Sequence, residues 1–343
     1  MNTGHKAGVK SICQQLVKRS VSGFIFMMGV SGLNAYAAPD EDKLGKGAGY
    51  PTGNSDTMYQ QRYRVGSFSG TDQIYPFVVT RRGDHINNLR RAASEPAITY
   101  LMDGKTYSID DYLARFPVTG LLIVKNGEIL VERYQYDRKD THRFLSKSMA
   151  KSITSLALGI ALSEGKIRSL DDKAADYVTE LAGFAYGETS LRDLLRMSSG
   201  VRFDESYATG SDLANFSWIG RNHGQLEGLK RFNERTAAPG ERFHYATTET
   251  VVLGLVIRAA TGRALADYVS EKIWQPMGAE SDAHWNVDAK GVERMGGWFN
   301  AVLRDYGRLG LLLANDGELD GRQILPKEYL IEATSWARHP PQF

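Results

Sequence analysis

Residues 121–161 constrain the fold of this chain more than any other part of the sequence. Two β-rich runs, residues 121–124 and 129–131, flank Asn126-Gly127, a dipeptide that supplies the positive φ angles of a tight hairpin turn. After a charged loop, apolar residues recur at helical spacing over residues 149–161, and Gly165 follows as a helix stop. The sequence therefore predicts a β-hairpin that leads into a strongly apolar, central helix.

The composition excludes several classes of protein. Hydrophobic residues make up 42% of the 343 residues and charged residues 24%, which is typical of a globular chain and not of a disordered one. The 42 basic and 40 acidic side chains nearly cancel, so the sequence has no basic footprint for nucleic acid. The one cysteine can form neither an intrachain disulfide nor a thiolate-rich zinc site. We expect no metal and no cofactor.

The first 37 residues have the layout of a secretory signal peptide. Basic side chains without an acidic residue precede a short apolar run at residues 21–30, and Ala35-Tyr36-Ala37 forms an A-x-A cleavage site. The alternative is an uncleaved anchor, but the apolar run is too short to span a bilayer. Because cleavage also removes Cys13, we expect an exported chain without disulfides and without a stable membrane anchor, located in the periplasm or secreted.

The next part of the chain divides into two regions. Residues 38–75 are rich in Gly, Ser, Asp and Tyr and show no clear period, which predicts a linker or a loosely packed arm. Residues 76–343 carry the periodic segments and are expected to form the folded domain, with a helical lobe over about residues 170–290.

Ser148 and Lys151 stand at the start of the predicted apolar helix, at positions i and i+3 and therefore on one helical face. A serine hydroxyl at neutral pH needs a neighbour that takes its proton, and a lysine amine can do this. The N-terminus of a helix adds positive potential that favours an oxyanion. A second Ser-x-x-Lys pair, Ser163 and Lys166, lies at the end of the same helix, which is a poorer catalytic setting.

The context of Ser148 resembles the serine β-lactamase and penicillin-binding-protein superfamily. The order of the blocks matches the class C branch, and the resemblance is greatest to 6-aminohexanoate-dimer hydrolases and related esterases and amidases. It extends over roughly residues 118–330. The matching blocks are residues 144–152, 165–167, 169–172, 189–200, 239–247, 251–256, 261–262, 273–278 and 296–298.

The resemblance implies a second catalytic residue, Tyr245, which would relay the serine proton to the leaving group. The alternative is a half-buried structural tyrosine. Thr247, a further candidate for substrate binding, stands where this superfamily usually has asparagine. Because a hydroxyl cannot match the donor pair and acceptor of an amide, we do not expect lactam substrates.

Three aromatic residues are candidates for substrate binding. Tyr207 stands where the dimer hydrolases carry a second tyrosine beside the leaving group, although it can equally be a simple aromatic lining. Trp218 and Trp298 are placed to wall the cleft, and the alternative for both is packing.

The end of the chain departs from the superfamily pattern. A third motif is expected on a strand near the C-terminus, beside the N-terminal hairpin in one sheet. Here residues 303–314 and 326–334 read as helices, and no β-rich block follows Gly296-Gly297. We therefore expect a sheet that is incomplete at its C-terminal end and a chain that is truncated.

The resemblance implies an α/β (α+β) fold in the β-lactamase manner, an antiparallel sheet flanked by helices with the site between sheet and lobe. The expected function is a serine hydrolase that cleaves a small-molecule amide or ester, with Ser148 as nucleophile, Lys151 as base and Tyr245 as relay. The alternative is a non-catalytic penicillin-binding-like protein that binds cell-wall peptide or a partner.

Overall fold

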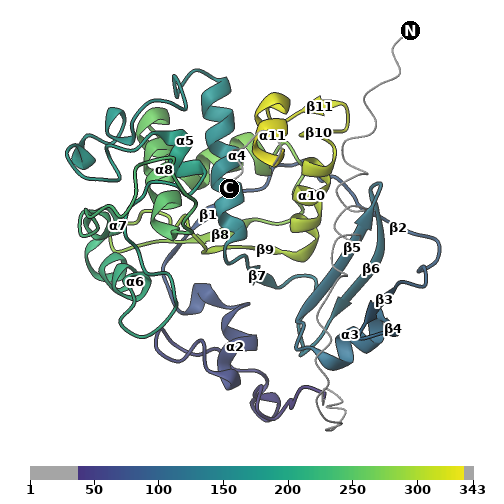
Figure 1. Ribbon diagram of the computed structural model, residues 1–343. Coiled ribbons are helices and arrows are strands. Elements are labelled where there is room, and N and C mark those ends of the chain that lie inside the picture. Colours follow the sequence, from purple (N-terminus) through teal and green to yellow (C-terminus); the bar gives the residue numbers. More distant parts are fainter. Residues whose placement is uncertain (1–37, 336–343) are drawn as a thin grey trace. The chain divides into compact units, whose positions relative to one another are not determined.

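The computed structural model describes residues 38–335, in which antiparallel sheets are flanked by helices as expected (Figure 1). The predicted signal peptide and residues 336–343 lie outside the described residues, so cleavage after Ala37 stays a prediction. Among residues 38–335, no helix combines the length and apolar character needed to cross a bilayer.

The central sheet has the strand order β1-β8-β9-β7, and every neighbouring pair is antiparallel. Its strands are β1 (Phe77–Thr80), β8 (Ala283–Asn286), β9 (Phe299–Val302) and β7 (Arg143–Leu145). The expectation that no strand follows Gly296-Gly297 is wrong, because β9 begins two residues later. All four residues of β9 are buried, so the strand lacks the polar alternation by which a half-buried strand is found in a sequence.

The predicted hairpin is confirmed as β5 (Gly120–Lys125) and β6 (Glu128–Tyr134), with positive φ angles of 52° at Asn126 and 78° at Gly127. The short strand β2 (Arg90–Arg91) pairs with β6 in parallel, and the order β2-β6-β5 forms a separate three-stranded sheet. Within the described residues the hairpin therefore does not join the central sheet.

The predicted apolar helix is α4 (Met149–Ser163), which lies at the centre of the fold. It packs against α8 (Thr247–Thr261), and α8 in turn packs against α5 (Leu191–Leu195). Figure 1 shows the helices of the lobe on the side of α4 that faces away from the hairpin. The other lobe helices are α6 (Asp212–His223), α7 (Gln225–Leu229) and α9 (Leu265–Val269).

The segment predicted as a linker or loose arm is folded against the domain. It contains the helix α2 (Gln61–Ser67), and the side chains of Met58 and Val65 are buried. The hydroxyl of Thr71 donates to Oδ1 of Asn300 on β9 at 2.8 Å, and the amide of Leu145 on β7 donates to the Phe68 carbonyl. The side chains through which this segment packs are spaced irregularly along the chain. Its sequence therefore shows neither the helical nor the strand periodicity of apolar residues.

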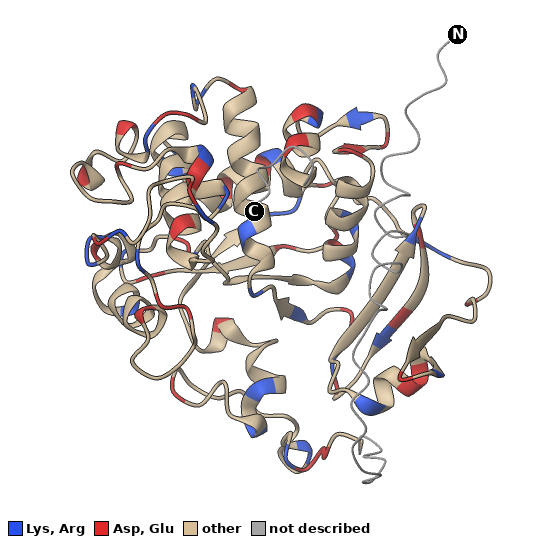
Figure 2. Ribbon diagram, viewed as in Figure 1, with Lys and Arg blue, Asp and Glu red and all other residues tan. Residues whose placement is uncertain are grey.

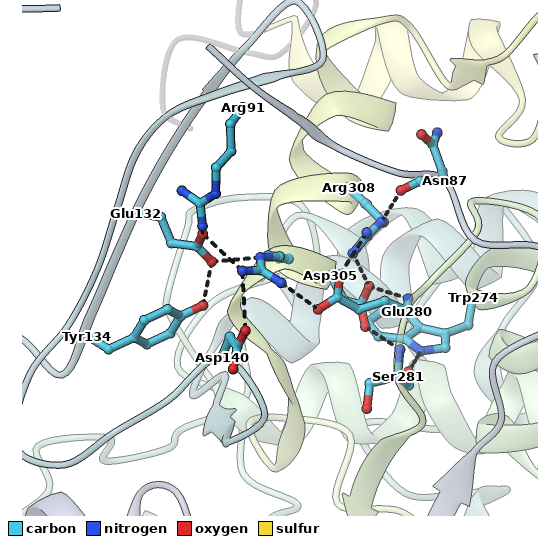
Figure 3. A network of polar contacts seen from close by, with 11 residues as sticks. Asn87, Arg91, Glu132, Tyr134, Asp140, Trp274, Glu280, Ser281, Asp305 and Arg308 are labelled. Carbon is cyan, nitrogen blue, oxygen red and sulfur yellow. Dashed lines mark hydrogen bonds and ion pairs between the residues drawn. The ribbon is translucent and has the colours of Figure 1, made fainter. Parts of the chain in front are cut away.

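A polar network joins the hairpin to the helix α10 (Leu303–Ala314), whose bounds are those predicted (Figure 3). Arg304 on α10 donates to the buried carboxylate of Glu132 on β6 at 2.7 Å and pairs with Asp140 at 3.3 Å. Burial alone raises the pKa of Glu132, but hydrogen bonds from Arg304 and Tyr134 outweigh it and the pKa lies below its usual value. The network therefore fastens the hairpin through charge-assisted hydrogen bonds.

The remaining elements are short. They are the strands β3 (Thr99–Met102), β4 (Lys105–Ser108), β10 (Glu318–Leu319) and β11 (Arg322–Gln323), the helices α3 (Ile109–Arg115) and α11 (Lys327–Thr334), the 3-10 turns η1 (Lys46–Ala48), η2 (Thr71–Gln73), η3 (Ala174–Asp176) and η4 (Thr179–Leu181), and the π-helical turn η5 (Ser270–Trp274).

Candidate active site

Ser148 is positioned by the connection between β7 and α4. The amide of Ser146, directly after β7, donates to the carbonyl of Phe299 on β9 at 2.8 Å. Lys147 then adopts a positive φ of 48°, and Ser148 stands at the N-terminus of α4. Its hydroxyl makes no capping bond to the helix, so Oγ is available for other partners.

Two side chains converge on the hydroxyl of Ser148. Nζ of Lys151 lies 3.0 Å from Ser148 Oγ, and the hydroxyl of Tyr245 donates to the same oxygen at 2.8 Å. Lys151 is buried, and its Nζ lies 5.1 Å from the centre of the Tyr245 ring. The structure thus brings together the three residues that the sequence singles out for chemistry.

Gly296 holds Lys151 in place through its backbone. Its carbonyl accepts a hydrogen bond from Lys151 Nζ at 2.5 Å. A Cβ atom at position 296 would lie 2.3 Å from Cγ2 of Thr247, closer than any carbon contact allows, so glycine is required where this segment passes α8. The Gly296-Gly297 pair is thus part of the site.

The second Ser-x-x-Lys pair has a different setting. The hydroxyl of Ser163 donates to the carbonyl of Ile160 at 2.8 Å, in the last turn of α4. Since Lys166 lies beyond the end of the helix and is exposed, this pair offers no activated hydroxyl.

A cavity of about 570 Å³ opens at Ser148. Of the residues predicted to bind substrate, Tyr207, Thr247 and Trp298 line it, and Trp218 does not. Trp218 lies on α6 with 55% of its surface exposed, and its ring contacts His223. The structure thus brings three of the four predicted binding residues to the cavity wall.

Thr247 has a partner that sequence reasoning missed. The carboxylate of Glu205 accepts hydrogen bonds from both the backbone amide and the hydroxyl of Thr247. The hydrogen bond from the amide is 2.5 Å long. Glu205 therefore satisfies a backbone donor in the first turn of α8 and ties the loop of Tyr207 to the segment that carries Tyr245. No motif marks Glu205, since its partner is 42 positions away.

Lys147 was also missed, although it directly precedes Ser148. Its Nζ donates to the hydroxyl of Tyr59 at 3.0 Å and lies 4.5 Å from the ring centre of Phe68. Burial first, and then the charges of Arg294 and Arg64, lower the pKa of Lys147 to about 8. Tyr59 and Phe68 come from the segment predicted as an arm, so that segment builds part of the site.

The described residues show no group of three or more His, Cys, Asp or Glu side chains arranged to hold a metal ion.

Comparisons with known proteins agree on the superfamily. The family described as Beta-lactamase matches residues 108–343. The 6-aminohexanoate-dimer hydrolase of Paenarthrobacter ureafaciens is 23% identical over 296 residues, which cover 83% of this chain and 73% of that protein. A provisionally named D-alanyl-D-alanine carboxypeptidase of Escherichia coli is 29% identical over 189 residues, 48% of this chain and 42% of the relative.

A solved structure shares the fold. It is that of a provisionally named 6-aminohexanoate-dimer hydrolase from Bacillus anthracis, with a TM-score of 0.74 and 24% identity. The match covers 86% of this chain and 78% of the other.

Proposed function

The chain belongs to the beta-lactamase family of serine hydrolases, and we propose that it cleaves an amide or ester of a small carboxylic acid through an acyl-enzyme on Ser148. The observation that carries this proposal is the pair of hydrogen bonds, from Lys151 and Tyr245, that meet on one serine oxygen. Such convergence of a base and a proton carrier on a hydroxyl is the arrangement that activates a nucleophile.

In the acylation step, Lys151 serves as the base that takes the proton of Ser148 as Oγ forms a bond to the substrate carbonyl carbon. The carbonyl electron pair moves onto oxygen, and the N-terminus of α4 stabilises the resulting negative charge. The bond to the leaving group then breaks, Tyr245 gives its phenol proton to the departing amine or alcohol, and the proton that Lys151 took from Ser148 restores the phenol. In the second half of the reaction water attacks the acyl carbon, the bond from that carbon to Oγ breaks, a proton from water returns to Oγ of Ser148, and the acid is released.

The names of the relatives support an acyl-transfer reaction, but they do not agree on one substrate. One is named for a 6-aminohexanoate dimer and another for a terminal D-alanine bond. Position 247 is a threonine that is bound by Glu205, so no side-chain amide is present there to bind a lactam. We therefore propose a linear amide or ester as substrate.

We also propose that the segment 1–37 directs export of the protein to the periplasm or the medium.

A fluorophosphonate probe tests the nucleophile directly. We expect mass spectrometry to place one adduct on the peptide that contains Ser148, and we expect Ser148→Ala to abolish labelling. Ser163→Ala is the matched control because it removes the serine of the other Ser-x-x-Lys pair, and it should label like the unmodified protein. A folded protein that is labelled nowhere would instead favour a non-catalytic binding protein.

A further inference from the structure

The wall of the active-site cavity carries positive charge without compensating acidic side chains. Apart from Lys151, the proposed base, the lining includes Lys147, Arg221 and Arg294, and no Asp or Glu. Elsewhere in the described chain, Lys and Arg are interspersed with Asp and Glu (Figure 2). The charge of this cavity is therefore a local feature.

Arg294 is the most unusual of these cations. Its side chain is buried, with only 6% of the residue exposed, and Nη1 has no hydrogen-bond partner. Burial first, and then the nearby charge of Arg221, lower the pKa of Arg294 to about 10, against the opposing effects of Tyr75, Tyr59 and Asp288. A buried guanidinium without an anionic partner is unfavourable, so a structure that keeps one in a substrate cavity suggests that a ligand supplies the anion.

Asp288, the carboxylate whose charge acts on Arg294, is already engaged. Both oxygens of Asp288 accept hydrogen bonds, Oδ1 from the amides of Lys290 and Val292 and Oδ2 from the amide of Gln225 at 2.7 Å. Among residues 38–335, no ion pair joins Asp288 to the guanidinium of Arg294, and Nη1 of Arg294 has no hydrogen-bond partner.

The surroundings of Arg294 favour a planar anion. Its guanidinium carbon lies 3.7 Å from the centre of the Trp298 ring and 5.3 Å from that of Tyr75. These rings offer no hydrogen-bond acceptor to Nη1, which has no partner, and the planar fork of a guanidinium matches a carboxylate in two parallel hydrogen bonds. Nζ of Lys147, the residue before Ser148, lies 5.8 Å from the centre of the same Trp298 ring. A second cation therefore lies near this ring.

We infer that Arg294, flanked by Arg221 and Lys147, forms a carboxylate-binding subsite, and that the substrate carries a free carboxylate in addition to the bond that Ser148 attacks. This inference rests on the proposed hydrolase function. The substrate carboxylate neutralises the positive charge of the cavity wall. Its binding at Arg294 selects substrates by the distance between the carboxylate carbon and the carbonyl carbon that Ser148 attacks.

Two pairs of ester substrates test the subsite. The first is mono-p-nitrophenyl glutarate against its methyl ester, with the charge on the acyl half. The second is 4-butyryloxybenzoate against its methyl ester, with the charge on the leaving group. We expect the anionic member of at least one pair to have a kcat/KM about tenfold or more above its neutral partner, equivalent to about 1.4 kcal/mol.

Arg294→Gln should remove that preference, mainly through KM, so that kcat/KM falls about tenfold more for the anionic ester than for its neutral partner, because the change removes charge recognition. Arg90→Gln is the matched control, since it removes an exposed arginine on β2. Equal losses on charged and neutral esters in a folded variant would contradict the subsite.

The unmodified enzyme decides the question even where Arg294→Gln does not fold. Glutarate should inhibit hydrolysis of the neutral ester more strongly than glutaramide does. Ser148-dependent hydrolysis with no preference for either anionic ester overturns the carboxylate subsite and leaves the hydrolase intact. Hydrolysis that survives Ser148→Ala overturns the hydrolase mechanism itself.

Discussion

The hydroxyl of Tyr245 lies 2.8 Å from Oγ of Ser148, although 97 positions separate the two residues in the chain. The contact exists because α8, which follows Tyr245, packs along α4, which begins after Ser148. The buried interface between the two helices therefore fixes the distance on which the proposed proton transfer depends.

Ser148 and Lys151 should behave as one unit. Ser148→Ala and Lys151→Ala should each lower kcat by about 10³-fold or more, and the double variant should be little worse than either single one, since each removal disables the same step. Steady-state hydrolysis of a p-nitrophenyl ester measures this. Additive losses would show that the two residues serve separate steps.

Tyr245→Phe should discriminate between leaving groups. The phenol is proposed to protonate the departing atom, and general acid catalysis of this kind contributes about 10²–10⁴-fold. An amide, whose amine leaves poorly without a proton, should therefore lose more than a p-nitrophenyl ester, whose phenolate leaves unaided. Parallel assays on one acyl group check the prediction, and equal losses on both substrates would assign Tyr245 to the activation of Ser148 alone.

Glu205 should position the start of α8. Glu205→Ala leaves the amide and hydroxyl of Thr247 without their acceptor, and loss of such a helix-terminal bond destabilises a protein by about 1 kcal/mol. Urea unfolding measures the stability, and kcat reports any shift of Tyr245. Glu234→Ala is the control because Glu234 forms an exposed pair with Arg202. We expect Glu205→Gln to recover part of both losses.

Glu249 should make stability depend on pH. Burial raises its pKa to about 8, and Oε2 has no hydrogen-bond partner. Because the folded pKa exceeds the unfolded value of 4.5, the folded state binds more protons between these values. The contribution of Glu249 to stability is therefore complete below pH 4.5 and is lost as the pH rises toward about 8. Glu249→Gln should flatten the fall in Tm between pH 5 and pH 8, and the same change at the exposed Glu241 should not.

The predicted signal peptide is open to a direct test. N-terminal sequencing of exported protein should begin at Ala38, because small residues at positions 35 and 37 suit the peptidase. Replacement of Ala37 by a bulky residue should retain the full-length chain. Exported material that begins at Met1 would contradict cleavage.

The local elements were predictable because their information is local. Asn126-Gly127 specifies a turn through its own backbone preference, and helical periodicity identifies α4 and α10 through apolar faces. Ser148 and Lys151 lie on one helical turn, so their proximity follows from helix geometry alone. Spacing within an element was enough for each of these.

Only the tertiary structure decided the rest of the site. Tyr59 and Arg294 reach the cavity from segments without periodicity, and β9 escaped notice because full burial removes the polar alternation of a strand. Glu205 meets Thr247, and Tyr245 meets Ser148, only after distant segments pack together. The sequence by itself determined the hairpin, the central helix and the Ser148–Lys151 pair; packing over long chain separations determined which other side chains face them.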